Sequence, residues 1–372
     1  MINQSKFNIN KATELPEFKW LVAILLSFII ATLIAVNREL HIKFLIEYLK
    51  LFFTMLIAFK LLDNERKLKY AILFYLIGVA YIGFEAFNVG RNSMLRVEGI
   101  GMVDSPDANT TAATLVPALP LLIYYGWQAQ WKMKLVYLGL TVLIVNGLVL
   151  INSRGAFLGA FLGIVYFLTF MFFSKYKLPK QRLMLTLIFV AIIIGSIRLM
   201  DDHFWQRMQT IESTASKDSE GSGGRRINFW LATFDVMKDH PLGVGIYGYQ
   251  TLSPYYIKDE SSLSSVNGEK MRAVHSIWFQ GIAEIGWHGF FFFIMLLHAC
   301  KKHMSKAKKR LLEQQKFSLY YQGIALEAAM IGYLASSTFI DQFRSQILYW
   351  LLLFCISFSV ISLRKNQQLK PD

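Results

Sequence analysis

Long apolar runs recur along the chain, separated by short polar segments. The hydrocarbon core of a bilayer is roughly 30 Å thick and offers no partner to an open backbone, so an apolar run of about 20 residues predicts a spanning helix. We expect about ten such helices, at residues 20–36, 43–60, 70–88, 112–127, 134–151, 156–174, 182–200, 276–299, 319–340 and 345–363. The pattern therefore predicts an all-α, polytopic membrane protein.

Composition agrees with this class, since 54% of the 372 residues are hydrophobic and 15% are aromatic. The formal net charge is +14, but the basic residues are concentrated in short loops, so no nucleic-acid partner is expected. Cys300 and Cys355 are far apart without metal-ligand spacing, which argues against a disulfide or a zinc site. Residues 1–19 are polar, and no small-residue cleavage site follows the first apolar run, so that run should remain as the first helix.

The basic loops predict the orientation, because Lys and Arg in short loops stay on the cytoplasmic side. Parity puts six basic segments on one side: Lys6, Lys11 and Lys19; Lys60, Arg66, Lys67 and Lys69; Lys132 and Lys134; Lys175, Lys177, Lys180 and Arg182; 301–310; Arg364 and Lys365. Both termini are therefore expected in the cytoplasm. By subtraction, residues 89–111, 152–154, 201–275 and 341–344 face the other side.

This topology divides the chain into three parts. Residues 1–200 hold helices one to seven with short loops, 201–275 form a large periplasmic loop, and 276–372 hold helices eight to ten and a cytoplasmic tail. Within the large loop, the Ser/Gly-rich residues 213–224 predict a flexible piece. The pattern over 226–240 predicts an amphipathic helix at the membrane interface.

The glycine-punctuated segment 241–248 follows that helix. It could bring backbone close to a ligand, but no Walker-type lysine follows its glycines, so a simple turn is favoured over a phosphate cradle.

Arginines on the outer side are the first candidates for chemistry. Arg154 stands between two apolar runs with almost no connection, where an arginine is costly without a partner or a function. Arg225 and Arg226 begin the interfacial helix, and guanidinium groups suit bidentate contact with phosphate. The alternatives are snorkelling to lipid headgroups or, for Arg225 and Arg226, pairing with carboxylates of the same loop.

His275 stands where the long loop re-enters the membrane, and a neutral imidazole can take a proton from a hydroxyl near neutral pH. A satisfied interfacial histidine is the alternative. Glu284 follows in the same helix and could orient His275 or a substrate. The other histidines considered, His41 near an outer turn and His298 and His303 at the cytoplasmic end, have no predicted charged company.

Other outer residues are weaker candidates. We expect Arg91, Asn109 and Tyr247 to contact substrate together with Arg225 and Glu284, although Asp107 or Asn109 could simply cap a helix. The acidic pairs Asp104/Asp107 and Asp201/Asp202 could bind a divalent cation, but no further ligand is suitably spaced. No metal and no cofactor are therefore predicted.

Two motifs in this order resemble the O-antigen ligase and polymerase superfamily. The first is Ser153-Arg154-Gly155-Ala156-Phe157-Leu158, and the second runs from Arg226-Ile227-Asn228 through His240-Pro241-Leu242-Gly243 to His275 and Gly286. The similarity extends from about Asn109 to Gly289. The segment around His275 and Glu284 is especially similar to O-glycosylation ligases of exosortase-type systems.

The resemblance implies a GT-C-like, metal-independent glycosyltransferase in the bacterial inner membrane. Its donor would be an undecaprenyl-diphosphate-linked glycan and its acceptor a lipid, polysaccharide or protein. By the same resemblance Arg226 binds carrier phosphate, Arg154 assists, and His275 activates the acceptor hydroxyl for inverting transfer. Ligase, polymerase and protein O-oligosaccharyltransferase stay open, as do a secondary transporter and a non-catalytic scaffold.

Overall fold

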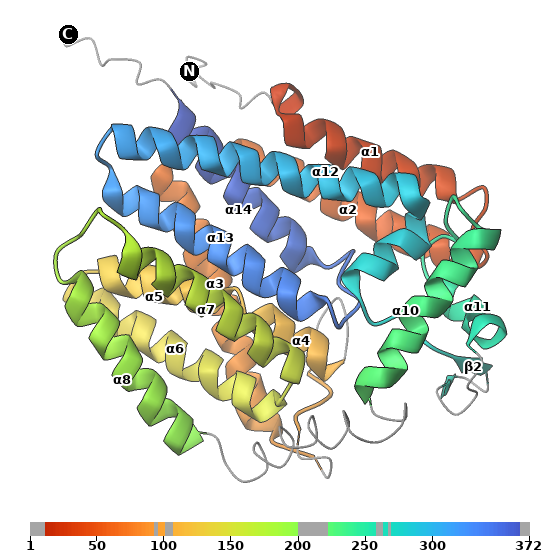
Figure 1. The fold of residues 1–372 in the computed structure, drawn as a ribbon, viewed down its shortest axis with the longest axis horizontal. Coiled ribbons are helices and arrows are strands. Elements are labelled where there is room, and N and C mark those ends of the chain that lie inside the picture. The colour runs from red at the N-terminus through yellow and green to blue at the C-terminus, as the bar shows by residue number, and fades with distance from the viewer. Residues whose placement is uncertain are drawn as a thin grey trace, which may run out of the picture.

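We analysed a computed structural model that describes residues 12–92, 96–100, 107–199, 222–257, 263–266 and 269–364. Its elements are η1 (Ala12–Glu14), α1 (Pro16–Ala31), α2 (Arg38–Leu61), α3 (Glu65–Val89), α4 (Ala108–Leu115), α5 (Ala118–Gln128), α6 (Trp131–Ile151), α7 (Arg154–Phe173), α8 (Gln181–Leu199), α10 (Ser222–Asp239), α11 (Gly248–Tyr256), β1 (Ser264–Val266), β2 (Glu269–Met271), α12 (Ile277–Glu313), α13 (Phe317–Ser337) and α14 (Gln346–Leu363) (Figure 1). The two strands pair as an antiparallel hairpin.

Every predicted span corresponds to helix in the structure, although some spans are divided, broken or of different length. The run at 112–127 is divided between α4 and α5, because Pro117 cannot donate a backbone hydrogen bond within a continuous helix. The helix predicted to end at 299 continues to Glu313. This extension buries Met304, Ala307 and Leu311. Their helical spacing places them on one face, which packs the C-terminal part of α12 against the bundle.

Five helices in the described part of the chain are long and apolar enough to cross a membrane: α3, α6, α7, α12 and α14. The protein is therefore a multi-pass membrane protein by length and composition. The count of ten spans stays a prediction.

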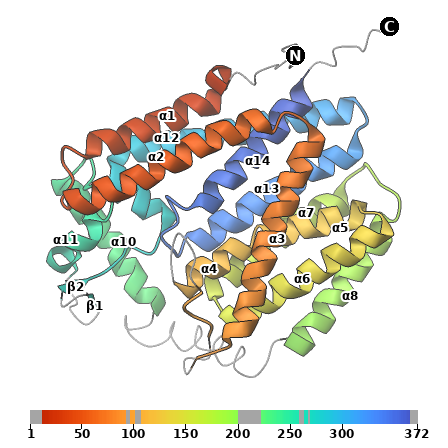
Figure 2. The ribbon, with the colours of Figure 1, turned by 180° about the vertical axis from the view of Figure 1, so that it is seen from behind.

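Small residues let the central helices approach closely. A Cβ added to Gly159 of α7 would lie 2.4 Å from the carbonyl oxygen of Gly332 in α13, and one added to Gly83 of α3 would lie 2.2 Å from that of Leu143 in α6. Such contacts are typical of helix packing in membranes, where helices associate through close van der Waals packing and small residues let their backbones approach. α1 and α12 also pack along each other, and they lie side by side in both views (Figures 1 and 2).

The predicted cytoplasmic connections gather at one end of the bundle, which we call the basic end. The guanidinium of Arg310 donates to the carbonyl of Leu363 at 2.6 Å, and that of Arg364 donates to the carbonyl of Asp63 at 2.5 Å. His303 lies at this end, and its Nδ1 is 2.9 Å from Oε1 of Glu17. The sequence missed this pair because 286 positions separate the partners.

α12 is not continuous, since Ile285 and Gly286 have non-helical dihedral angles, with φ +69° at Gly286. Residues 241–245 fill this break. The amide of Val244 donates to the carbonyl of Ala283 at 2.8 Å, and the amide of Gly245 donates to that of Glu284 at 3.1 Å. A Cβ on Gly243 would lie 2.6 Å from the nitrogen of Gly286. The glycine segment therefore binds the chain's own backbone, as expected for a structural turn.

Candidate functional site

α10, α11, the two strands and the start of α12 lie together at the end of the bundle opposite the basic end (Figures 1 and 2). We call this end the polar end. α10 confirms the helix predicted over 226–240, but it begins at Ser222, inside the piece predicted to be flexible. Phe229 and Val236 are buried, whereas Ile227, Leu231 and Phe234 are exposed. This two-sided pattern suits a helix at a membrane interface, and that location stays a prediction.

His275 is fixed in an unusual conformation between β2 and α12. Its φ of +53° is a left-handed value that non-glycine residues seldom adopt. Val274 anchors the segment by packing with Val236, Val244 and Ala283. On the other side, Oδ1 of Asp341 accepts the amide of Ser276 at 3.1 Å, and the same carboxylate accepts the amide of His275.

Asp341 therefore holds His275 through the backbone. Burial raises the pKa of this carboxyl to about 7, although the two backbone hydrogen bonds oppose the rise. The sequence placed Asp341 in an outer turn without giving it a role. A carboxylate in a short turn between two apolar helices was the available signal, but its contact with Ser276, next to His275, spans 65 positions.

Arg154, Arg226 and Arg272 form an arginine cluster around His275. Burial lowers the pKa of Arg226, and the charges of Arg154 and Arg272 lower it further. Phe229 links the cluster to the histidine, since the guanidinium carbon of Arg272 lies 5.3 Å from the Phe229 ring centre and the ring centre of His275 lies 6.3 Å from it. The structure thus brings together Arg154, Arg226 and His275, which the sequence selected, and adds Arg272.

The same surroundings keep His275 neutral. Burial, and then the charges of Arg272 and Arg226, lower the pKa of His275 to about 4, while Asp107 acts in the opposite direction. At neutral pH the imidazole therefore carries a free lone pair beside fixed positive charge. This combination can accept a proton from one group and stabilise negative charge on another.

A cavity of about 460 Å³ opens next to His275. Its lining comes from α2, the start of α4, α11, the segment before α12, and residues 340–350. The polar lining residues are Glu47, Lys50, Thr54, Asp107, Thr110, Gln250, His275, Gln280, Asp341, Gln342, Arg344, Ser345 and Gln346, and the aromatic ones are Phe44, Tyr48, Tyr247 and Trp350. A polar cavity with several aromatic walls can bind a carbohydrate.

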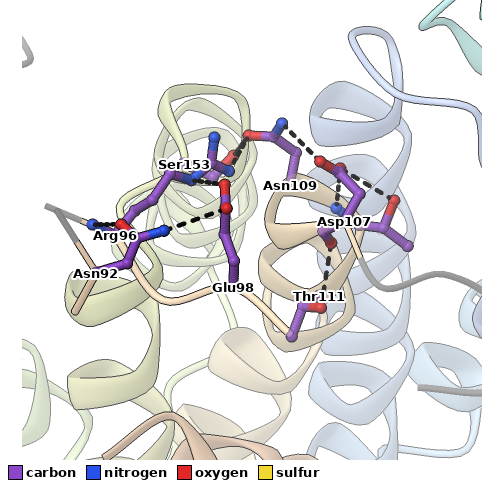
Figure 3. Close-up of polar contacts among 8 residues, drawn as sticks. Asn92, Arg96, Glu98, Asp107, Asn109, Thr111 and Ser153 are labelled. Atoms are coloured by element: carbon purple, nitrogen blue, oxygen red, sulfur yellow. Dashed lines mark hydrogen bonds and ion pairs between the residues drawn. The ribbon is translucent and has the colours of Figure 1, made fainter. Parts of the chain in front are cut away.

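A polar network holds the corner that carries Arg154 (Figure 3). Oδ1 of Asn109 accepts the hydroxyl of Ser153 at 2.9 Å and a guanidinium hydrogen bond from Arg96 at 3.4 Å. Ser153 directly precedes Arg154, the first residue of α7. The carboxylate of Asp107 accepts the amide of Thr110 at 3.1 Å, so Asp107 is the predicted cap of α4.

The remaining predicted site residues have different surroundings. Tyr247 lines the cavity, where the guanidinium carbon of Arg344 lies 5.0 Å from its ring centre. Glu284 is buried and pairs with Nε of Arg344 at 2.9 Å, and its expected contact with His275 or a substrate stays a prediction. Arg91 donates to the carbonyl of Val149 at 3.2 Å. Arg225 lies in α10, and its side chain is outside the described residues.

Within the described ranges, no group of three or more His, Cys, Asp or Glu side chains could hold a metal ion. Asp104 and the Asp201/Asp202 pair lie outside those ranges.

The fold and site define a multi-pass membrane protein that gathers arginines and a neutral histidine at one end. A protein-family comparison then gives the relationship: residues 139–294 match the family model described as O-Antigen ligase. The resemblance to the O-antigen ligase-like superfamily is thereby confirmed, and it supports an O-antigen ligase or polymerase-like role. The match includes Arg154, Arg226 and His275 and ends before Asp341. No curated protein matched the chain.

Proposed function

We propose that this protein is an inverting glycosyltransferase at the periplasmic face of the bacterial inner membrane. It transfers a glycan from an undecaprenyl-diphosphate carrier to an acceptor hydroxyl. One observation carries the proposal: His275, kept neutral by burial and positive charge, lies beside the arginine cluster and lines a polar cavity.

In the proposed reaction, His275 takes the proton of the acceptor hydroxyl. The hydroxyl oxygen forms a bond to the anomeric carbon, and the bond from that carbon to the phosphate oxygen breaks. The carrier diphosphate leaves with the bonding electron pair. Arg226 and Arg154 stabilise its charge, and preorganised positive charge of this kind supplies a large part of the rate.

Donor binding also prepares the base. A histidine whose pKa is about 4 is a weak base, and the charges of Arg272 and Arg226 contribute to that low value. A bound diphosphate places negative charge beside these arginines, which returns the pKa of His275 towards its usual value near 6.5. His275 therefore becomes a competent base when the donor is in place.

The test uses the purified protein with a defined lipid-diphosphate glycan and compares glycolipid, protein and second-glycan acceptors. In His275→Asn, asparagine tolerates the left-handed backbone but is not a base. We expect transfer to fall by about 10²–10⁴-fold, the range typical of a general base. His288→Asn is the matched control, because His288 lies on α12 against Phe292, away from the cavity.

Two results would contradict the proposal. One is unchanged transfer by a folded His275→Asn protein. The other is solute uptake into vesicles without any transferase activity, which would favour a secondary transporter.

A further inference from the structure

Trp230 carries a buried hydrogen-bond donor that the fold leaves unused. In the described part of the chain its indole Nε1–H has no hydrogen-bond partner, and the nitrogen is shielded from solvent. Buried donors, including tryptophan N–H groups, are nearly always paired in folded proteins. An unpaired one costs free energy, and a ligand that accepts the hydrogen bond removes that cost. The indole N–H therefore points to a ligand.

The Trp230 ring lies next to the arginine cluster. Trp230 follows Arg226 by four residues on α10, and residues at this spacing share one face of a helix with Cβ atoms about 5–6 Å apart. The Trp230 ring centre is 6.2 Å from that of Phe339, and a Cβ added to Gly155 would lie 3.6 Å from the Phe339 ring. Since Gly155 directly follows Arg154, the ring lies between the two arginines that the sequence selected.

Aromatic contacts fix the orientation of this ring. The rings of Trp230 and Phe279 are stacked, with centres 5.3 Å apart and planes 10° apart. Phe234 lies edge-on to Phe279, with ring centres 5.6 Å apart. Phe279 is in the first turn of α12, four residues after His275. A donor held in this way is preorganised, so it loses little conformational freedom when a ligand binds.

The neighbours of the N–H indicate which kind of ligand atom it binds. A guanidinium and an indole both donate hydrogen bonds and accept none, so the arginines beside Trp230 cannot satisfy it. The acceptor must come from elsewhere. An anionic phosphate oxygen suits both groups, because hydrogen bonds to ionised acceptors are about twice as strong as those between neutral groups.

We propose that Trp230 is a substrate-binding residue whose indole N–H donates to the diphosphate of the lipid carrier, next to Arg226 and Arg154. The arginines supply charge, and the indole supplies a neutral donor in a fixed direction. The hydrogen bond strengthens as the departing diphosphate gains charge, so it also stabilises the transition state. This inference rests on the proposed function and adds a residue that the sequence analysis did not select.

The first test removes the N–H and keeps an aromatic ring. In Trp230→Phe the phenyl ring can still stack on Phe279 but has no donor. Trp278→Phe is the matched control, because the Nε1–H of Trp278 donates to the hydroxyl of Thr338 at 3.0 Å. For each protein we would measure the Kd for undecaprenyl diphosphate, the Kd for the complete lipid-diphosphate glycan, the rate of transfer and the melting temperature.

We expect Trp230→Phe to raise both Kd values by about tenfold, the equivalent of roughly 1.4 kcal/mol. Trp278→Phe should leave both Kd values unchanged. Both variants lose the same ring volume, but only Trp278→Phe breaks an internal hydrogen bond, so the melting temperature should fall further in that variant. The opposite order, with unchanged Kd values in Trp230→Phe, would show that Trp230 is only structural.

The outcomes separate this inference from the proposed function. Unchanged Kd values in Trp230→Phe, with normal transfer by the wild type, would overturn the inference alone. A rise confined to the glycan-bearing donor would assign the N–H to a sugar and overturn it as well. A rise for undecaprenyl diphosphate in a protein that transfers no glycan would support the inference and count against the proposed function.

A second measurement observes the N–H directly in the wild-type protein. Selective ¹⁵N labelling gives each of the eight tryptophans an indole N–H signal. Undecaprenyl diphosphate should move the Trp230 proton signal downfield, as a charge-assisted hydrogen bond does, and leave the Trp278 signal in place. An unmoved Trp230 signal at a saturating carrier concentration would refute the contact.

Discussion

The two ends of the bundle both carry many cations but arrange them differently. At the basic end each described contact of a cation satisfies the protein itself: Arg310 and Arg364 bind backbone carbonyls, and Lys308 pairs with Glu327. At the polar end the charges of Arg154 and Arg272 instead lower the pKa of Arg226, and those of Arg226 and Arg272 lower the pKa of His275. Positive charge gathered in this way, with Asp107 and Asp341 opposing part of its effect on Arg226, suits an anionic ligand.

The largest difference between the two ends is expected when one arginine at each end is replaced by alanine. Arg226→Ala should lower kcat/KM for glycan transfer by about 10²–10³-fold, because it removes a preorganised charge at the leaving group. Arg310→Ala should leave kcat/KM little changed but should lower the free energy of unfolding by about 1–3 kcal/mol, since two partly buried carbonyls lose a charged donor. The measurements are steady-state transfer and denaturation in the same detergent.

Equal losses of activity in the two variants would remove the distinction between the ends. Arg226→Lys sharpens it, because lysine keeps the charge but cannot make the bidentate contact. We expect its activity to lie between wild type and Arg226→Ala.

The next effect concerns the break in α12, which links the bundle to the polar end. In Gly286→Ala the new Cβ would lie 2.5 Å from the backbone carbon of Leu242, at a φ of +69° that suits glycine. We expect a loss of more than about 2 kcal/mol in the free energy of unfolding. Gly78→Ala in α3 is the control, because nothing lies within 4 Å of its added Cβ. A similar melting temperature for both variants would contradict the backbone pairing described for the break.

The smallest effect is a pH dependence that separates His275 from Asp341. The pKa of His275 falls from 6.5 to about 4 on folding, so its neutral form supports stability that is lost as pH falls from 6.5 to 4. The pKa of Asp341 rises from 3.8 to about 7, so the stability from its protonated form is lost as pH rises from 4 to 7. The two contributions oppose each other in the wild type.

Single substitutions reveal each contribution. In Asp341→Asn the melting temperature should rise with pH between 4 and 6.5, and in His275→Asn it should fall with pH between 4 and 7. Differential scanning fluorimetry across this range measures both slopes. Parallel curves for the two variants would show that these groups do not titrate as described.

Local patterns in the sequence were enough for most of the helices and for three members of the site. Apolar length predicts a helix wherever about 20 residues must cross the membrane, and a costly charge in an outer turn marks Arg154. The break at Gly286 was missed, because a glycine inside an apolar run is only a weak signal. Cys300 and Cys355 are far apart in sequence, and the packing of α12 against α14 brings the two buried, free cysteines close together, which no local pattern predicts.

The parts that could not be predicted are tertiary contacts across long separations. Asp341 with His275 and Ser276, and Arg344 with Glu284, join residues about 60 positions apart. None of these contacts produces a periodic pattern of residues that could be recognised in the sequence. For this reason the pairing of Glu284 with Arg344 was not predicted, and its contact with substrate stays a prediction.

The break in α12 has a consequence for engineering. Residues 241–245 complete the backbone hydrogen bonds of α12 at residues 283–287, so α10 and α11 are joined to this helix by main-chain contacts that no surface substitution can reproduce. A chimera that exchanges 222–257 between relatives should therefore fold only when the broken turn of α12 is transplanted with it. The two segments form one graftable module.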